Sequence, residues 1–353
     1  MILLTGSTGY LGSQIAQELV RRGIPFRVLV RDPSRLKLEI GNWKFENRNS
    51  KFETRNSKVE TRNSKVETRS AAAGYEIVIG DLSDPGALAR ALRGVQQVIH
   101  TAALVKVWAK DRQDFWRVNV DGLKNLCRAA AKAGVERIVY TSSFIALGPS
   151  ADPNAGEELR HDGKFRNEYE QTKAEALVWL RDEGYRQFPV ITLLPGVIYG
   201  KGPLTEGNMV GNMIHQYLFK MMPALVGSGR QRWSFAYNRD VAAAHVAALT
   251  AGRLGQEYIL GGDNRSLNDF YRALAQVSGL RHRVRHVPFG VGKILGGMDV
   301  ALALVAPHQP VLTPGAIEIF KHDWVYSSGK AVRELNYHVT PLDEGLRATL
   351  ANA

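Results

Sequence analysis

The first twelve residues place the tightest constraint on the fold of this chain. An apolar run, Ile2–Leu4, leads directly into glycines at positions 6, 9 and 12, spaced as T-G-x-x-G-x-x-G. A helical pattern over Leu11–Arg22 follows at once. Glycines allow a tight turn between a strand and a helix, and they let a pyrophosphate approach the positive end of that helix. The pattern predicts a strand–turn–helix unit that binds a dinucleotide.

Short apolar runs and helical patterns alternate after this unit, which implies strands joined by helices that cover both faces of a parallel sheet. We expect an α/β fold, a Rossmann-type doubly wound parallel sheet over residues 1–194. The expected strands are Ile2–Leu4, Phe26–Val30, Glu76–Ile79, Gln97–His100, Arg137–Thr141 and Val190–Leu194. The expected helices are Leu11–Arg22, Pro85–Leu92, Phe115–Ala133 and Glu168–Arg181.

The second half of the chain has a looser pattern. We expect residues 195–353 to form mainly a smaller, interleaved C-terminal substrate lobe. Residues 236–262, which include an expected strand at Glu257–Leu260, are predicted to return to the first domain.

A low-complexity repeat interrupts the first half at residues 46–70. Its seven-residue units, such as ETRNSKV, hold one apolar residue each (Phe52, Val59 and Val66), so the paired apolar seam of a coiled coil is missing. We interpret the insert as a solvated, mostly disordered loop, with a lone charged helix as the second choice. It is left out of the fold prediction.

Composition excludes several classes of protein. Cys127 is the only cysteine, which rules out an internal disulfide and fits a reducing, cytoplasmic location. The N-terminus has no basic region ahead of its apolar residues, so it reads as a strand and not as a signal peptide. The net charge is +12, but the basic residues are scattered without a nucleic-acid-binding motif. We therefore expect no nucleic acid partner.

No transmembrane span and no metal site are expected either. The most apolar stretch, Val287–Ala306, is interrupted by Lys293 and Asp299 and by glycines. The histidines show no metal-ligand spacing.

The end of the second expected strand bears on the choice of cofactor. An acidic residue there would bind the ribose of NAD, whereas this chain has Arg31, with Arg35 four residues on. Guanidinium groups suit a 2′-phosphate, so NADP is favoured and NAD stays open, since Asp32 could still reach a ribose hydroxyl. The full set of expected cofactor-binding residues is Gly6, Thr8, Gly9, Tyr10, Leu11, Gly12, Arg31, Arg35, Asp81, Leu82, Thr101, Ala102, Ala103, Lys173, Pro195 and Val197.

Three residues form a candidate catalytic set. Tyr169 and Lys173 are four apart on an expected helix and so share a face, while Ser143 follows the fifth expected strand. A free tyrosine has a pKa of about 10, too high for a base at neutral pH. A nearby lysine ammonium and an oxidised nicotinamide would favour the phenolate. The serine would hold the substrate oxygen within reach of the phenol.

With these motifs in place, the chain resembles the extended short-chain dehydrogenase/reductases over nearly its whole length outside the insert. Matching stretches are TGSTGYLG, GDLSDP, HTAA, VNVDGLKNL, YTSSFIALG, YEQTK, LPGVIYGKG and RDVAAAHVAAL. It is most similar to the dihydroflavonol-reductase-like branch, especially farnesol-dehydrogenase-like proteins. The resemblance implies catalytic roles for Ser143, Tyr169 and Lys173, with Ser142 as the neighbouring register, and a supporting role for Asn119. Farnesol dehydrogenases are described as using NAD, which conflicts with the interpretation of Arg31.

The leading hypothesis is reversible hydride transfer between NAD(P) and a secondary or allylic alcohol. The first alternative is a nucleotide-sugar epimerase or dehydratase with tightly bound NAD. Such enzymes often carry an asparagine near the end of the sixth strand, where this chain reads Leu194-Pro195-Gly196-Val197. Arg230 and Arg232 could still hold phosphates, so this alternative stays open. The second alternative, a non-catalytic dinucleotide sensor, is weakened because such proteins tend to lose the tyrosine or the lysine.

We expect an apolar or aromatic small-molecule substrate, because candidate wall residues are aromatic, aliphatic or methionine. They are Val105, Trp108, Phe144, Met209, Met213 and Trp233. The apolar, glycine-broken segment Pro288–Ala306 would line the mouth of the site or rest on a membrane surface as a peripheral contact. A homodimer is compatible with the sequence.

Overall fold

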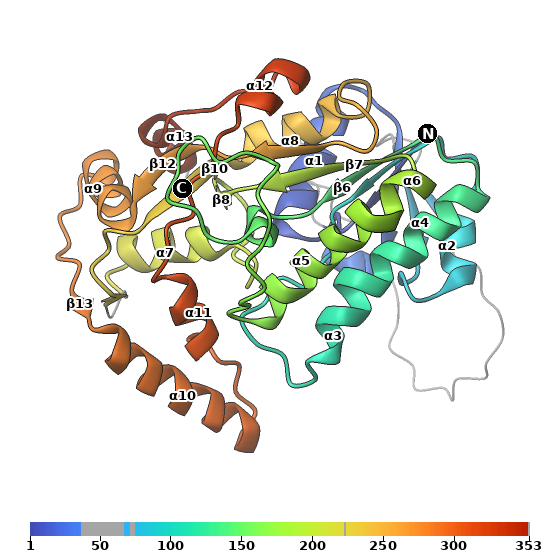
Figure 1. Cartoon of the computed structure of the whole chain (residues 1–353). Coiled ribbons are helices and arrows are strands. Elements are labelled where there is room, and N and C mark those ends of the chain that lie inside the picture. The colour runs from blue at the N-terminus through green and yellow to red at the C-terminus, as the bar shows by residue number, and fades with distance from the viewer. Residues whose placement is uncertain (37–66, 71–74, 222–223, 352–353) are drawn as a thin grey trace.

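The main sheet has eight strands in the order β11-β7-β6-β5-β1-β2-β4-β3 (Figure 1). The structure is a computed structural model that describes residues 1–36, 67–70, 75–221 and 224–351. Seven strands run parallel, and their order is that of a Rossmann-type doubly wound sheet, as predicted. The parallel strands are β1 (Ile2–Thr5), β2 (Phe26–Val30), β4 (Tyr75–Ile79), β5 (Gln97–His100), β6 (Arg137–Thr141), β7 (Val190–Pro195) and β11 (Glu257–Leu260).

Both faces of this sheet are buried. Along β1, Ile2 and Leu4 face one core and Leu3 faces the other, so every apolar residue of the strand is buried. The first core is covered by α1 (Tyr10–Arg21), α8 (Asn238–Ala247) and α12 (Gly329–Leu335). The second is covered by α2 (Pro85–Ala91), α4 (Gly122–Lys132) and α5 (Glu168–Trp179). Burial on two faces explains why these strands read as continuous apolar runs.

One expected helix, Phe115–Ala133, is divided in the structure. It consists of α3 (Gln113–Trp116), a π-helical segment η2 (Arg117–Asp121) and α4. A second π-helical segment, η4 (Leu180–Gly184), links α5 to α6 (Tyr185–Gln187). Sequence periodicity does not detect such local widening, because the flanking helical turns keep their apolar faces.

A second lobe is built on a smaller sheet of β8 (Val197–Tyr199), β10 (Arg232–Tyr237) and β12 (Asp263–Ser266). Strand β10 pairs parallel to β8 and antiparallel to β12. The two-residue strands β9 (Leu225–Val226) and β13 (His286–Val287) form a separate parallel pair. The helices of this part of the chain are α7 (Met209–Leu218), α9 (Leu267–Ser278), α10 (Phe289–Val305), α11 (Pro314–Ile319) and α13 (Leu342–Leu350).

The chain returns to the main sheet between β10 and β12. Helix α8 packs against α1, and β11 pairs parallel to β7. In Figure 1 the yellow and orange segments of this stretch lie beside the blue N-terminal part. The second lobe is thus built from chain segments that come before α8 and after β11.

The repeat insert meets the sheet at its last four residues. Glu67–Ser70 forms β3, which pairs antiparallel to β4. The expectation of a loop was wrong for these residues, because β4 would otherwise leave a row of unpaired backbone groups at the edge of the sheet. The rest of the predicted loop, residues 46–66, lies outside the described residues.

Phe235 tests the packing of the second lobe. It is fully buried on β10, and its ring stacks on Phe270 with 5.0 Å between centroids. Phe235→Ala should lower the free energy of unfolding by about 3–5 kcal/mol in denaturant titration, because a cavity replaces the ring. The control Val178→Ala, at a position 45% exposed, should change it little. Equal losses in both variants would contradict this packing.

Candidate active site

The glycine turn brings β1, α1 and β5 into direct backbone contact. Gly6 has φ +77°, and a Cβ there would lie 2.6 Å from the backbone nitrogen of Ala102. A Cβ on Gly12 would lie 2.1 Å from the carbonyl oxygen of Gly6. Neither position accepts a side chain without moving backbone, so the glycines are required by the geometry of the turn.

The N-terminus of α1 has the chemistry of a phosphate site. Gly9 is its N-cap, and no side chain of the described residues caps the helix. Ser7, also in the turn, has a buried hydroxyl with no hydrogen-bond partner among the described residues. Free backbone N–H groups at the positive end of a helix, beside an unused hydroxyl, fit a dinucleotide pyrophosphate. Ser7 was not among the predicted residues.

The end of β2 leaves a guanidinium group available. The Arg31 side chain is 73% exposed, and its Nε lies 3.9 Å from Oδ2 of Asp81. The Asp32 carboxylate instead accepts from the backbone nitrogen of Ser34 at 3.0 Å and from its hydroxyl at 2.6 Å. These bonds hold the pKa of Asp32 below its usual value. Of the two neighbours, Arg31 is therefore freer to meet a cofactor.

Arg35 is exposed at the end of the short 3₁₀ helix η1 (Pro33–Arg35). Asp81, one of the predicted cofactor-binding residues, accepts from the backbone nitrogen of Ser83 at 2.9 Å and from its hydroxyl at 2.8 Å. Its carboxylate thus shapes the turn before α2, and its contact with a cofactor stays a prediction.

Several other predicted cofactor residues are engaged in packing around the turn. The Tyr10 hydroxyl donates to the carbonyl of Gly200 at 3.0 Å, and the Thr101 hydroxyl donates to that of Thr5 at 2.8 Å. Leu82 is buried and Leu11 packs on the first core. Of the remaining residues, Thr8 lies in the turn, Ala102 and Ala103 follow β5, Pro195 ends β7 and Val197 begins β8.

The structure gathers the three candidate catalytic residues at the end of β6. Ser143 lies just beyond that strand, and Tyr169 and Lys173 lie one turn apart on α5. Lys173 is buried, with Nζ donating to the carbonyl of Thr141 at 3.0 Å and to the hydroxyl of Tyr140 at 3.5 Å. The lysine is therefore fixed to the strand that leads to the serine.

Burial shifts the pKa of Tyr169 and the pKa of Lys173 in the directions that disfavour their charged forms. It raises the pKa of Tyr169 to about 12, opposed by a hydrogen bond with Ser143. It lowers the pKa of Lys173 to about 7. We expected the lysine to favour the phenolate, yet Ser143 is the side chain of this protein that lowers the tyrosine's pKa. The phenol is thus protonated in the protein alone.

A buried polar layer behind Lys173 was missed by the sequence analysis. His100 Nδ1 lies 2.7 Å from the hydroxyl of Thr5, and its ring stacks on Tyr140 with 5.7 Å between centroids. Burial, with a smaller contribution from Lys173, lowers the pKa of His100 to about 3. The imidazole is therefore neutral at physiological pH. The HTAA stretch held the signal, but only its small residues entered the prediction.

Asn119 ties the loop after β5 to the catalytic helix. Its Oδ1 accepts from the backbone nitrogen of Leu104 at 2.7 Å, and its Nδ2 donates to the hydroxyl of Thr172 at 3.0 Å. The residue lies in the π-helical segment η2, a feature often found near functional sites. These bonds agree with the supporting role that the resemblance implies.

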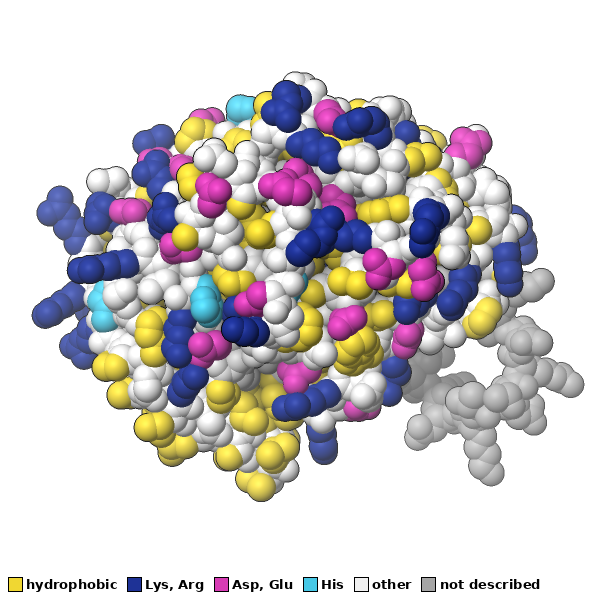
Figure 2. Space-filling view, in the orientation of Figure 1, with side chains coloured by type: hydrophobic (Ala, Val, Ile, Leu, Met, Phe, Trp, Pro, Cys, Tyr) yellow, Lys and Arg dark blue, Asp and Glu magenta, His cyan; other side chains and the backbone are white. Residues whose placement is uncertain are grey.

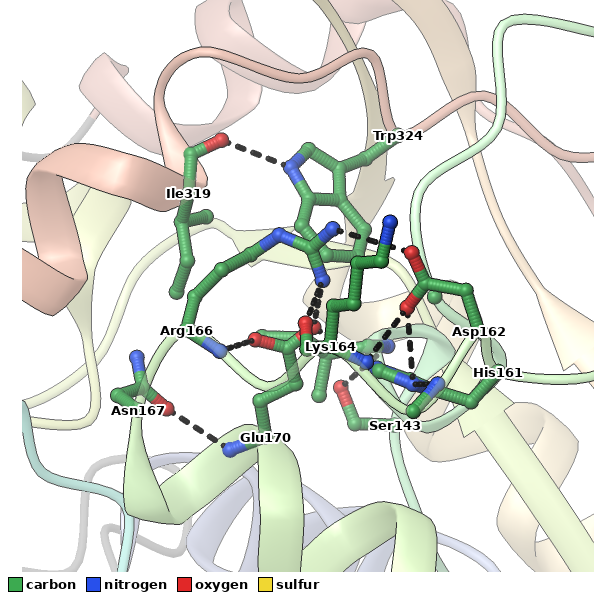
Figure 3. A network of polar contacts seen from close by, with 12 residues as sticks. Ser143, His161, Asp162, Lys164, Arg166, Asn167, Glu170, Ile319 and Trp324 are labelled. Carbon is green, nitrogen blue, oxygen red and sulfur yellow. Dashed lines mark hydrogen bonds and ion pairs between the residues drawn. The ribbon is translucent and has the colours of Figure 1, made fainter.

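The start of α5 is fixed by a buried ion-pair network (Figure 3). Arg166 and His161 both contact Oε1 of Glu170, at 2.5 Å and 2.9 Å. Asn167 caps the helix by accepting from the backbone nitrogen of Glu170 at 2.8 Å. Because Glu170 follows Tyr169, the network fixes the helical turn from which the Tyr169 side chain extends. The spacing of these residues gave no signal that they converge.

The predicted substrate wall divides into two groups. Val105 and Met209 are exposed, and the loop after β5 meets the segment before α7, where Lys106 and Glu206 lie 3.2 Å apart. Trp108 is half-buried on the same loop, and Met213 is partly buried against the lobe core. These four remain candidates for a cleft wall.

The other two predicted wall residues lie in the core of the lobe. Phe144 packs edge-on against Trp324 and Tyr326. Trp233 is 1% exposed, with 4.8 Å between its ring centroid and that of Phe320. Both side chains belong to the buried apolar cluster of the lobe, and a role in the cleft wall stays a prediction.

An open surface cavity of about 480 Å³ is lined by none of the three catalytic candidates. It is lined by Pro149, Ser150, Ala151, Arg230, Gln231, Lys321, His322 and Asp323. Within the described ranges, no group of three or more His, Cys, Asp or Glu side chains could hold a metal ion. Nor does that part of the chain contain a helix long and apolar enough to cross a membrane.

The fold and the glycine turn define a Rossmann-type dinucleotide-binding protein. Residues 2–261 match the NAD dependent epimerase/dehydratase family, and the chain belongs to this family. This confirms, at the level of the family, the resemblance drawn from the motifs.

Known relatives span nearly the whole chain. It is 27% identical to the protein named "Putative dihydroflavonol 4-reductase" of Synechocystis sp., over 97% of this chain and 91% of the relative. It is also 27% identical to a 3-beta-hydroxysteroid dehydrogenase of Mycolicibacterium neoaurum, over 95% and 86%. The crystal structure of gox2253 has a TM-score of 0.74 and 29% identity, covering 99% of this chain and 97% of that one.

The depressed pKa of Lys173 predicts a pH-dependent stability in the absence of cofactor. Its folded pKa of about 7 lies below the ordinary 10.5, so the unfolded chain binds the extra proton between these values. The loss of stability that burial of Lys173 causes is complete below about pH 7 and decreases as the pH rises. The free energy of unfolding of the wild type, minus that of Lys173→Met, should increase by at most about 1.4 kcal/mol per pH unit.

Denaturant titrations of both proteins from about pH 7 to about pH 9 would measure this difference. For the control Lys132→Met, at an exposed position on α4, the wild-type-minus-variant free energy of unfolding should show no such increase with pH. A wild-type-minus-Lys173→Met difference that stays constant with pH would refute the assignment.

Proposed function

We propose that the protein is an NAD(P)-dependent oxidoreductase that interconverts a secondary or allylic alcohol and its carbonyl compound. The observation that carries the proposal is the convergence of Ser143, Tyr169 and Lys173 at the end of β6, in the same sheet as the glycine turn after β1. Strand ends near the centre of such a sheet are where its ligands bind. The relatives named as a reductase and a dehydrogenase support the same class.

The bound nicotinamide would supply or accept the hydride at the substrate carbon. Ser143 holds the substrate oxygen, and Tyr169 takes the hydroxyl proton during oxidation or returns it during reduction. The phenol, with a pKa of about 12, is already protonated and so ready to donate during reduction. Lys173, fixed to Thr141, would bind ribose hydroxyls.

We infer an apolar or aromatic substrate. Val105, Trp108, Met209 and Met213 offer surfaces suited to such a molecule. One relative is named as a hydroxysteroid dehydrogenase, and a steroid is a molecule of this chemical class. NADP is the cofactor that Arg31 favours, since its guanidinium is exposed just after β2, the strand that pairs with β1.

A nucleotide-sugar epimerase or dehydratase is the second candidate, because the description of the family names epimerases and dehydratases. One of its two candidate phosphate ligands is already engaged: Arg232 donates to Asp323 at 3.3 Å and to the carbonyl of Ala151 at 2.8 Å. Arg230 is exposed and lines the surface cavity, whereas Arg232 does not line it. This arrangement favours the oxidoreductase. The presence of both Tyr169 and Lys173 likewise argues against a non-catalytic sensor.

Tyr169→Phe tests the acid/base assignment. Turnover should fall by about 10²–10⁴-fold, because the phenol proton is lost while the ring remains. Cofactor affinity, measured by nicotinamide fluorescence, should stay unchanged. Tyr75→Phe, on the distant strand β4, should keep full activity.

The same assay would use steroid-like, isoprenoid and flavonoid-like carbonyl compounds and UDP- or GDP-sugars as substrates. A Tyr169→Phe variant with most of its kcat would refute the catalytic role. Turnover of the sugar nucleotides alone would favour the epimerase candidate.

Arg31→Asp tests the cofactor preference. Replacing a phosphate-binding cation by a ribose-binding carboxylate should lower the ratio of kcat/KM for NADPH to that for NADH by about tenfold or more. Arg347→Asp, at an exposed position on α13, should leave the ratio unchanged. A wild-type enzyme that already prefers NADH several-fold would show that Arg31 does not bind a 2′-phosphate.

A further inference from the structure

Helix α10 turns its large apolar side chains toward the solvent. In Figure 1 the helix projects from the lower edge of the lobe, and Figure 2 shows hydrophobic side chains gathered there. Their exposed fractions range from 49% to 84%, for Ile294, Leu295, Met298, Leu302, Leu304 and Val305. An exposed apolar surface on this scale marks an interaction site.

The inward face of α10 is made of small residues. Gly292, Gly296 and Ala303 are its buried positions. A Cβ on Gly292 would lie 2.8 Å from Val226, and one on Gly296 would lie 3.1 Å from Ile317. A helix that covers a core and faces water has its large apolar residues inside. Here the close packing depends on glycine, and the large residues are left outside.

Both charged residues of α10 are paired within the chain. Lys293 lies 2.7 Å from the carboxylate of Glu318 on α11. The Asp299 carboxylate contacts His308 and accepts from the backbone nitrogens of Val311 at 2.9 Å and Leu312 at 3.0 Å. The outward apolar face therefore contains no unpaired charge.

A basic segment leads directly into this helix. Residues 281–286 read RHRVRH, and Arg281, Arg283 and Arg285 are exposed. None of these three guanidinium groups forms an ion pair with a carboxylate of the described residues. Figure 2 shows Lys and Arg side chains along the left edge of the molecule, next to the apolar lower edge. Basic groups beside an apolar helix face complement a surface of anionic lipids.

The helix also borders the candidate cleft. Gln309, just beyond α10, donates to the carbonyl of Trp108 at 3.4 Å, on the loop after β5. Helix α11 lies between α10 and the catalytic helix, since a Cβ on Gly315 would be 2.4 Å from the carbonyl oxygen of Arg166. A surface bound to α10 would thus lie beside the loop that carries Val105 and Trp108.

We propose that the exposed face of α10, with the basic segment Arg281–His286, docks the protein onto an anionic lipid surface. A second copy of the chain fits this face less well. A symmetric dimer would bring the same patch of both copies together, and with it both basic segments. The docking goes beyond the proposed oxidoreductase activity and is measured without any turnover.

The test is co-sedimentation of the full chain with vesicles of phosphatidylcholine alone or mixed with phosphatidylglycerol. The wild type should bind the anionic vesicles, and added salt should weaken the binding. Ile294→Gln combined with Met298→Gln should lower the affinity by at least about tenfold, because two exposed apolar groups no longer enter the lipid. Arg281→Glu combined with Arg283→Glu should reduce binding to the anionic vesicles selectively.

Leu254→Gln is the matched control, because Leu254 is 48% exposed and lies outside α10. It should bind like the wild type. All substituted side chains are on the surface, and circular dichroism with unfolding midpoints would confirm that each variant folds. The proposal fails if the wild type ignores anionic vesicles or if the Ile294/Met298 variant binds them equally. It also fails if the wild type is a dimer that does not bind vesicles and the Ile294/Met298 variant is a monomer.

Discussion

The close contact of the first turn with the strand beside it is the constraint on which the site depends. Gly12 packs on the carbonyl of Gly6, and Gly6 packs on the backbone of Ala102. This contact draws β1, α1 and β5 together where the strand order reverses direction, between β1 and β5. A larger residue at either glycine would push the helix away from the sheet. The phosphate site at the start of α1 and the cleft beside β5 would then separate.

Burial sets the chemistry of the catalytic set. In water a lysine is charged and a tyrosine is neutral at pH 7. Within the protein the pKa of Lys173 falls to about 7, while that of Tyr169 rises to about 12. The bare protein therefore favours a protonated phenol and holds the lysine charge weakly. The positive charge of an oxidised nicotinamide and a bound substrate would change this balance, which couples proton transfer to the loading of the cofactor.

The sequence predicted the main sheet well because its strands are buried on both faces. Phe26–Val30, Gln97–His100, Arg137–Thr141 and Glu257–Leu260 have the predicted bounds. The strands of the second lobe could not be predicted from apolar runs. Strands such as β8 and β13 are only two or three residues long and depend on distant partners. Phe144 and Trp233, predicted for a cleft wall, pack in the core of this lobe, and a place in the wall stays a prediction. Their type fits a pocket or a core equally well, and only tertiary packing decides. The convergence of His161 and Arg166 on Glu170 likewise depends on a loop whose course the sequence does not encode locally.

Helix α10 shows what hydrophobic periodicity leaves out. The segment is apolar almost throughout, so its pattern does not say which side faces the protein. Its glycines decide, because close approach to Val226 and Ile317 is possible only on the side that lacks side chains. The two charged residues of the helix do not make the outer side polar. Lys293 pairs with Glu318, and Asp299 pairs with His308. The same packing that joins α10 to α11, and α11 to the start of the catalytic helix, therefore places an apolar surface beside the site.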